Sequence, residues 1–144
     1  MPKAKLRVTL ISHTPAPEKT IAAAAKLCYS PASLADLMDS LTDEKAADFV
    51  QMLASIGHES PIEHASFTFG IEGVSRAFLA QLTRHRIASY SVQSQRYVRE
   101  AQFDYVVPPK IEADPQAAAA FGEAMPDAQA HYDRIAALLK AQHT

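Results

Sequence analysis

Apolar and polar positions alternate in short stretches of the chain, and this spacing predicts strands. Residues 5–12 alternate at their start, and residues 67–72 alternate throughout, so one face of the second stretch is apolar. Such alternation is typical of a strand with one buried face, and we therefore expect residues 67–72 to be half-buried. A third strand is expected over residues 103–107, where the prolines at 108–109 stop it.

Four other stretches carry helix signals. A helix is predicted over residues 17–28, where a proline precedes a run of alanines. Thr42 is expected to cap a helix with an apolar stripe that ends at Gly57. Residues 75–86 predict a helix with a serine N-cap, and the alanine-rich chain beyond Asp114 predicts a further helix. Its apolar stripe is typical of a packing surface, so we assign it no chemistry.

These elements indicate an α+β fold, with one domain over residues 1–144 in which helices pack on a mixed or antiparallel sheet. A chain of this length buries roughly 70% of its unfolded surface, which suits a single domain. The formal net charge is −2, so clustered basic residues form a focused site rather than a nucleic-acid footprint. The sequence carries no secretion signal and no long apolar run, and we expect a cytoplasmic protein.

Cys28 is the single cysteine of the chain, which excludes an internal disulfide and fits a reducing compartment. A nucleophilic role would need an activating neighbour, and the residues around Cys28 offer no cue for one. We therefore expect this side chain to be a small buried filler.

Residues 81–97 carry three arginines and a histidine with no acidic residue to neutralise them. Guanidinium forks and hydroxyl groups suit phosphate oxygens, so the segment predicts a phosphate site. The plainer alternative is a solvated basic helix end, where cations oppose the macrodipole for about a few tenths of a kcal/mol. Six hydroxyl or amide side chains within residues 89–95 favour the phosphate site.

Two local geometries sharpen this prediction. In a helix that continues to residue 86, Gln81, Arg84 and His85 share one face and can converge on one ligand. In an extended backbone, Ser94 and Arg96 point the same way.

Residues 57–64 (Gly-His-Glu-Ser-Pro-Ile-Glu-His) superficially suggest a metal site. The two histidines, His58 and His64, are six apart, and Pro61 lies between them, so they cannot share a face of an uninterrupted helix. We expect a sharp connection from helix to strand and no metal. For both His58 and Glu63, a role in hydrogen bonds within this turn is as good an explanation as contact with a cofactor.

The run Arg84-His85-Arg86, followed after seven residues by Ser94 and then by Arg96-Tyr97, resembles the signature of the flavin-dependent thymidylate synthases. Residues 57–64 resemble a second block of that family at the expected distance upstream. The resemblance covers this chain but only the N-terminal part of the family. It implies a homotetramer in which subunits share sites.

The resemblance also implies an activity, the reductive methylation of dUMP to dTMP, with methylenetetrahydrofolate as carbon donor, FAD as hydride carrier and NADPH as reductant. The residues that it places near the flavin are His58, Ser60, Arg84, His85 and Arg86, with Glu63 as a further candidate. The residues that it places near the nucleotide are Gln81, Arg84, Ser94, Gln95 and Arg96.

No catalytic side chain is assigned within this segment. Ser94 lacks the base and orienting partner that a nucleophile needs, and the resemblance implies hydride delivery without a protein nucleophile. Val92 stands where family members often carry an acidic residue. The chain stops at Thr144 inside a predicted helix, whereas family chains continue into a segment with further flavin and uracil contacts. We therefore expect exposed apolar surface near the C-terminal helix.

Two other classes of protein would use the same arginines. A non-catalytic nucleotide-phosphate-binding module would bind a mononucleotide without a flavin. An RNA-binding domain would stack bases on Tyr90 and Tyr97 beside Arg84 and Arg96, and its affinity would fall steeply with salt. The acidic net charge and the absence of tryptophan argue against the RNA-binding domain.

Overall fold

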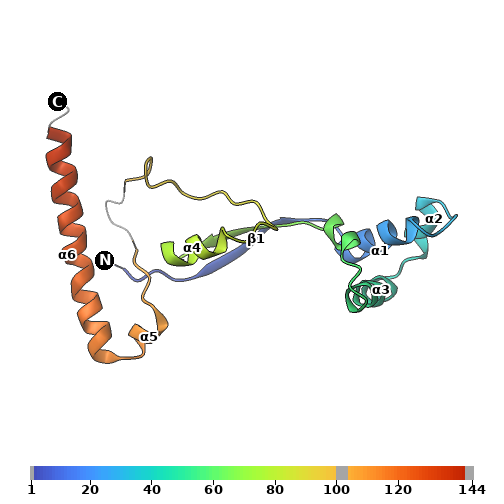
Figure 1. Cartoon of the computed structure of the whole chain (residues 1–144), viewed down its shortest axis with the longest axis horizontal. Helices are drawn as coiled ribbons and strands as arrows, with labels where there is room; N and C mark the ends of the chain where they lie inside the picture. The colour runs from blue at the N-terminus through green and yellow to red at the C-terminus, as the bar shows by residue number, and fades with distance from the viewer. Residues whose placement is uncertain (1, 100–103, 142–144) are drawn as a thin grey trace. The chain divides into compact units, whose positions relative to one another are not determined.

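The structure is a computed structural model that describes residues 2–99 and 104–141. It combines helices with a two-stranded antiparallel sheet, which confirms the α+β class (Figure 1). The elements in chain order are β1 (Arg7–His13), α1 (Pro17–Leu27), α2 (Leu34–Ser40), α3 (Asp43–Ser55), the 3₁₀ helix η1 (Ser60–His64), β2 (Phe67–Glu72), α4 (Arg76–Leu82), α5 (Pro109–Glu112) and α6 (Pro115–Ala141). The chain divides into two compact units, Val8–Gly70 and Met1–Arg7 with Ile71–Thr144.

The unit Val8–Gly70 holds a small helical core in which α1 packs against α2, α3 and η1. Alanines on α1 permit close approach between the helices, and Phe49 of α3 packs against both of the clusters that form this core. The buried apolar side chains of the clusters are Ile21, Ala22, Ala23, Ala25, Leu41, Ala46 and Leu53. This core fixes the position of η1, because Ile62 packs against its second cluster.

Serine and threonine caps begin two helices of this unit, α2 and α3. The Thr42 hydroxyl accepts the Lys45 N–H at 3.3 Å, which confirms the predicted cap of α3. Helix α2 was not predicted from the sequence. Its signal is a short capping pattern, in which Ser33 accepts the Asp36 N–H at 3.2 Å and donates to the Asp36 carboxylate at 2.7 Å.

Strand β2 lies at the predicted position, and β1 begins two residues later and ends one residue later than predicted, but β2 is not half-buried. Phe67 and Phe69 are each 52% exposed and Ile71 is 41% exposed. The prediction of half-burial was wrong because alternation marks the apolar face of a strand without supplying a layer to cover it. Beyond the ends of the strands, the Thr14 N–H donates to the Ser66 carbonyl at 2.9 Å.

The second unit contains α4, α5 and α6. Tyr105 makes an isolated parallel bridge with Lys3, and its ring lies 6.0 Å from the ring of Phe121 on α6. The predicted strand over 103–107 is therefore reduced to this bridge, and its first residue lies outside the described residues. Lys3 also pairs with Glu112 of α5 at 3.5 Å. These contacts connect the start of the chain to the segment before α6.

Two expectations about exposure have different outcomes. Apolar side chains of α6 are exposed as predicted, with Ile135 at 58%, Leu138 at 59% and Leu139 at 53%. Cys28, expected to be buried, is exposed, because it follows the last turn of α1 rather than the buried face of the helix. Within the described residues, no helix is long and apolar enough to span a membrane.

Candidate functional site

The first candidate site residues lie on and just after α4, and Ser75 caps the start of this helix. The Ser75 hydroxyl accepts the Phe78 N–H at 3.0 Å, which confirms the predicted cap. The helix ends at Leu82, four residues earlier than predicted, and the Thr83 hydroxyl donates back to the Leu79 carbonyl at 3.0 Å. This local bond competes with continuation of the helix.

The early end of α4 changes how the polar residues after it are grouped. The Arg84 N–H donates to the Gln81 carbonyl at 3.1 Å, and the His85 N–H donates to the Leu82 carbonyl at 3.1 Å. Because such i to i+3 bonds bring residues three apart over one another, Gln81 and Arg84 stay on the same side of the turn. His85 instead lies over Leu82, so the prediction of one helix face for all three polar residues was wrong.

A second turn holds Ser94 and Arg96. The Ser94 hydroxyl accepts the Arg96 N–H at 3.2 Å, and the Ser94 carbonyl accepts the N–H groups of Tyr97 at 3.3 Å and Val98 at 3.1 Å. We call residues 94–98 the 94–98 turn. The predicted extended backbone is replaced by this turn because a serine side chain readily accepts the N–H two residues ahead. The Arg96 guanidinium lies 5.7 Å from the centre of the Tyr97 ring.

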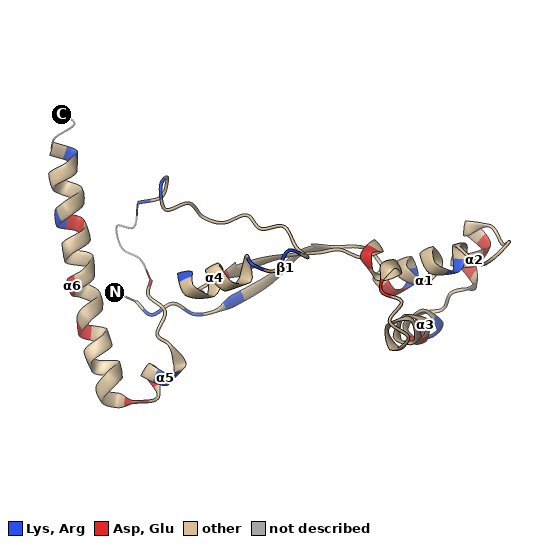
Figure 2. Cartoon of the chain, in the orientation of Figure 1, with Lys and Arg blue, Asp and Glu red and all other residues tan. Residues whose placement is uncertain are grey.

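The stretch from residue 73 to residue 99, here called the basic segment, carries a single sign of charge. It contains five arginines and no Asp or Glu, and Figure 2 accordingly shows blue but no red on α4 and the loop after it. Among residues 2–99 and 104–141, the ion pairs join Lys3 to Glu112, Arg7 to Glu72 and Lys19 to Asp43, and none includes an arginine of the basic segment. Exposed guanidinium groups without carboxylate partners fit a phosphorylated ligand.

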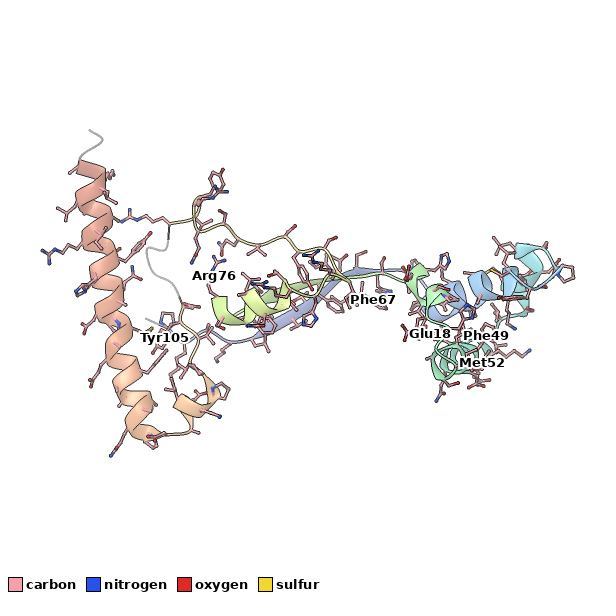
Figure 3. The ribbon with its side chains drawn as sticks, in the orientation of Figure 1. Glu18, Phe49, Met52, Phe67, Arg76 and Tyr105 are labelled. Carbon is pink, nitrogen blue, oxygen red and sulfur yellow. The ribbon has the colours of Figure 1, made fainter. Side chains whose placement is uncertain are left out.

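One hydrogen bond joins α4 to the chain just before the 94–98 turn. The Arg76 Nη2 atom donates to the Gln93 carbonyl at 3.1 Å. Arg76, labelled in Figure 3, stands at the first position of α4. Arg76 was not predicted to be a site residue, although a basic residue at a helix start without an acidic neighbour is an unusual local choice.

The other candidates follow the end of α3. Gly57 has a φ angle of 70°, and the His58 N–H donates to the Leu53 carbonyl at 2.9 Å while the Gly57 N–H donates to the Ala54 carbonyl at 3.1 Å. This pair of bonds is the Schellman motif, which confirms Gly57 as the residue that ends the helix. The backbone at His58 is therefore fixed by the end of α3.

The connection then continues into η1, in which Pro61 is buried. His58 is half-buried, whereas Ser60, Glu63 and His64 are exposed. The predicted sharp connection from helix to strand is confirmed. Among the described residues, no group of three or more His, Cys, Asp or Glu side chains could hold a metal ion.

The candidates are thus divided between the two units. His58 and Ser60 belong to the unit Val8–Gly70, whereas the basic segment belongs to the other unit. Within the second unit, the structure brings Gln81 next to Arg84 and brings Ser94 next to Arg96.

An open cavity of about 490 Å³ in the second unit was not predicted from the sequence. Gly73 lines it with a φ angle of 71°, and a Cβ atom at this position would collide with the Lys5 carbonyl. The charged side chains that line it are Lys3, Lys5, Arg7, Glu72 and Asp104. Since carboxylates stand among its cations, this cavity lacks the uncompensated charge of the basic segment.

The fold and the basic segment define an α+β protein with a candidate phosphate-binding loop. The profile of the family described as Thymidylate synthase complementing protein matches residues 9–143. The chain belongs to this family, and the family that its two motifs resemble is thereby confirmed.

Curated relatives carry the name Flavin-dependent thymidylate synthase. The chain is 53% identical to the Clostridium tetani protein over 138 residues, which covers 96% of this chain and 55% of that protein. It is 48% identical to the Nitratidesulfovibrio vulgaris protein over 145 residues, covering 97% of this chain and 59% of that protein. For the Geobacter sulfurreducens protein the identity is 48% over 122 residues, covering 83% of this chain and 53% of that protein. The chain thus spans about half the length of these relatives.

Proposed function

We propose that this chain carries the N-terminal part of an FAD-dependent thymidylate synthase that converts dUMP to dTMP. Methylenetetrahydrofolate would donate the carbon and NADPH the reducing equivalents. The family membership supports this proposal, and so do relatives named for a flavin-dependent synthase. The observation that carries it is the basic segment, whose exposed arginines have no carboxylate partner among the described residues.

The nucleotide phosphate would be held by Arg84, Ser94, Gln95 and Arg96. The Ser94 oxygen already accepts the Arg96 N–H, so its hydroxyl proton remains available to donate to a phosphate oxygen. The Arg96 guanidinium can make two parallel hydrogen bonds to the same phosphate. Gln81, which shares its side of the turn with Arg84, would lie near the rest of the nucleotide.

The flavin cofactor would be held by His58, Ser60, Arg84, His85 and Arg86. The cationic side chains in this set suit the phosphate oxygens of a dinucleotide, because Arg86 and Arg84 present guanidinium forks on an exposed loop. When bound, FAD supplies the hydride chemistry, and the protein contributes binding and orientation. His58 would present its ring from a backbone fixed by the Schellman motif.

We further propose that residues 1–144 form one domain, that the complete protein is a cytoplasmic homotetramer and that its subunits share sites. The exposed apolar side chains of α6 and of β2 support an assembly, since such faces gain stability when they are covered. No step of the proposed reaction requires a nucleophilic side chain from this chain. The Ser94 hydroxyl would serve as a phosphate ligand instead.

The test of this function is the visible absorption spectrum of the purified chain after incubation with FAD and gel filtration, measured with and without dUMP. We expect flavin to co-elute with the protein and its spectrum to change when dUMP is added. Arg84→Ala should release the flavin, whereas the matched control Arg134→Ala, an exposed arginine on α6, should retain it.

The outcomes separate the competing functions. If this chain and a C-terminally extended protein are both colourless but still bind dUMP, the synthase would be replaced by a non-catalytic nucleotide-binding module. A chain that retains neither ligand would be tested again with a C-terminally extended protein, and failure of that longer protein to bind either ligand would refute both functions. Binding of single-stranded RNA with steep salt dependence, in place of dUMP, would indicate the RNA-binding class.

A further inference from the structure

Arg76 occupies a position that its own helix disfavours. It is the first residue of α4, and the first turn of that helix contains no acidic side chain. The N-terminal end of a helix carries a partial positive charge, so a guanidinium there is slightly unfavourable. A residue that violates a local preference is often retained for a contact elsewhere.

That contact is with the chain that leads into the 94–98 turn. The Arg76 Nη2 atom donates to the Gln93 carbonyl at 3.1 Å, across a separation of 17 residues. Gln93 directly precedes Ser94, whose hydroxyl and carbonyl accept the three N–H groups that define the turn. Arg76 therefore contacts the loop immediately before the residues that would hold the nucleotide phosphate.

We propose that Arg76 is a positioning residue that fixes the 94–98 turn beside α4 for nucleotide binding, an inference that rests on the proposed function. Through Arg76, the 94–98 turn is joined to the start of the helix whose other end presents Gln81 and Arg84. Ser94 and Arg96 are thus held at a defined place relative to Arg84. The guanidinium suits this role because its planar fork loses little freedom for each hydrogen bond that it forms.

The first experiment tests, without any ligand, the hydrogen bond from Arg76 to the Gln93 carbonyl, which we call the tether. Amide hydrogen exchange at Arg96, Tyr97 and Val98 is compared in the wild-type chain and in Arg76→Ala by rapid-mixing NMR. Loss of one hydrogen bond of ordinary net strength should make these amides exchange about two- to tenfold faster. The matched control Arg134→Ala removes the same charge from α6 and should leave exchange in the turn unchanged.

A second variant separates the tether from the stability of α4. Arg76→Glu places a carboxylate where the helix dipole favours one, so amides of α4 should exchange more slowly or at the same rate. The amides of the 94–98 turn should still exchange faster, because a carboxylate cannot donate to the Gln93 carbonyl. Unchanged exchange in the turn of both Arg76 variants would overturn the inference.

The second experiment separates positioning from direct ligand contact. The dissociation constant for dUMP is measured by calorimetry in wild type, Arg76→Ala, Arg96→Ala and the double variant. We expect Arg76→Ala to weaken binding about two- to tenfold in wild type, and by less in the Arg96→Ala background, because part of its effect passes through Arg96. Fully additive losses would mean that the effect of Arg76 does not pass through Arg96, and would overturn the positioning role.

Failure of the proposed function would look different. A wild-type chain that binds no dUMP, together with faster exchange in the turn of Arg76→Ala, would refute a nucleotide site built by this chain alone and support the tether. Weaker dUMP binding in Arg76→Ala without faster exchange would support the nucleotide site and overturn the tether.

Discussion

Three glycines offer a graded test of how backbone conformation stabilises this fold. Gly57 and Gly73 have φ angles of 70° and 71°, whereas Gly122 lies inside α6. A Cβ atom added at Gly57 or Gly122 would meet nothing within 4 Å, while one at Gly73 would collide with the Lys5 carbonyl. Gly57→Ala therefore probes backbone strain alone, Gly122→Ala probes helix propensity alone, and Gly73→Ala probes strain combined with a clash.

The expected magnitudes follow from these environments. Gly57→Ala places an L-residue in the left-handed region, which costs about 1–2 kcal/mol of stability. The lower entropy of the unfolded chain offsets about 0.4–1 kcal/mol of this cost, so the net loss of stability is about 0.5–1 kcal/mol. Gly122→Ala should stabilise by up to about 1 kcal/mol, because alanine is the better helix former. Gly73→Ala should cost more than Gly57→Ala, because the Lys5 backbone cannot move aside as a side chain can.

The assay is urea unfolding followed by circular dichroism, with the slope of the transition checked for each variant. With a slope of about 1.5–2 kcal/mol per M, the midpoints of Gly57→Ala and Gly122→Ala should differ by about 1 M. Equal or inverted midpoints at unchanged slope would refute the argument from φ angles. A loss of stability in Gly122→Ala would mean that Gly122 relieves the ring of Pro126, which faces the carbonyl four residues earlier.

Three shorter predictions concern the core, a cap and the phosphate site. Leu53→Ala should lower the free energy of unfolding by about 2–5 kcal/mol, because the Leu53 residue is only 3% exposed. Leu34→Ala should change it by less than about 0.5 kcal/mol, because Leu34 is 55% exposed, and urea unfolding measures both changes. Thr42→Ala should cost about 1 kcal/mol in the same assay, because the Lys45 N–H loses its acceptor, and an unchanged midpoint would contradict the cap. Ser94→Ala should weaken dUMP binding yet leave measurable turnover in a complete, active protein, so lost turnover with intact binding would contradict its role as a phosphate ligand.

Short-range signals predicted much of the fold. The caps at Thr42 and Ser75 and the end of α3 at Gly57 each depend on hydrogen bonds within a few residues, so the local sequence contains their cause. Helix α2 was missed because its seven residues are too few to display a repeating apolar stripe. Its cap at Ser33 was the signal that could have revealed it.

The errors occurred where the outcome depends on more distant parts of the chain or on competition between local bonds. The exposure of Phe67 and Phe69 depends on what covers the sheet, and the exposure of Cys28 depends on where α1 ends. The grouping of His85 with Gln81 failed because the Thr83 hydroxyl bonds back into the helix and a tighter turn follows. The tether from Arg76 could not be predicted, since its acceptor is a backbone carbonyl 17 residues away.

The energetics of this tether show how order in the loop depends on its ligand. Roughly ten residues separate the end of α4 from Gln93, and closing a loop of that length costs about 2 kcal/mol from the length-dependent entropy alone. A single hydrogen bond contributes about 0.5–1.5 kcal/mol net, so the Arg76 contact offsets only part of this cost. The bonds within the 94–98 turn order that turn locally but do not place it against α4. A phosphate bound by both Arg84 and Arg96, as we propose, would close the same loop through a second link, and binding and ordering would then reinforce one another.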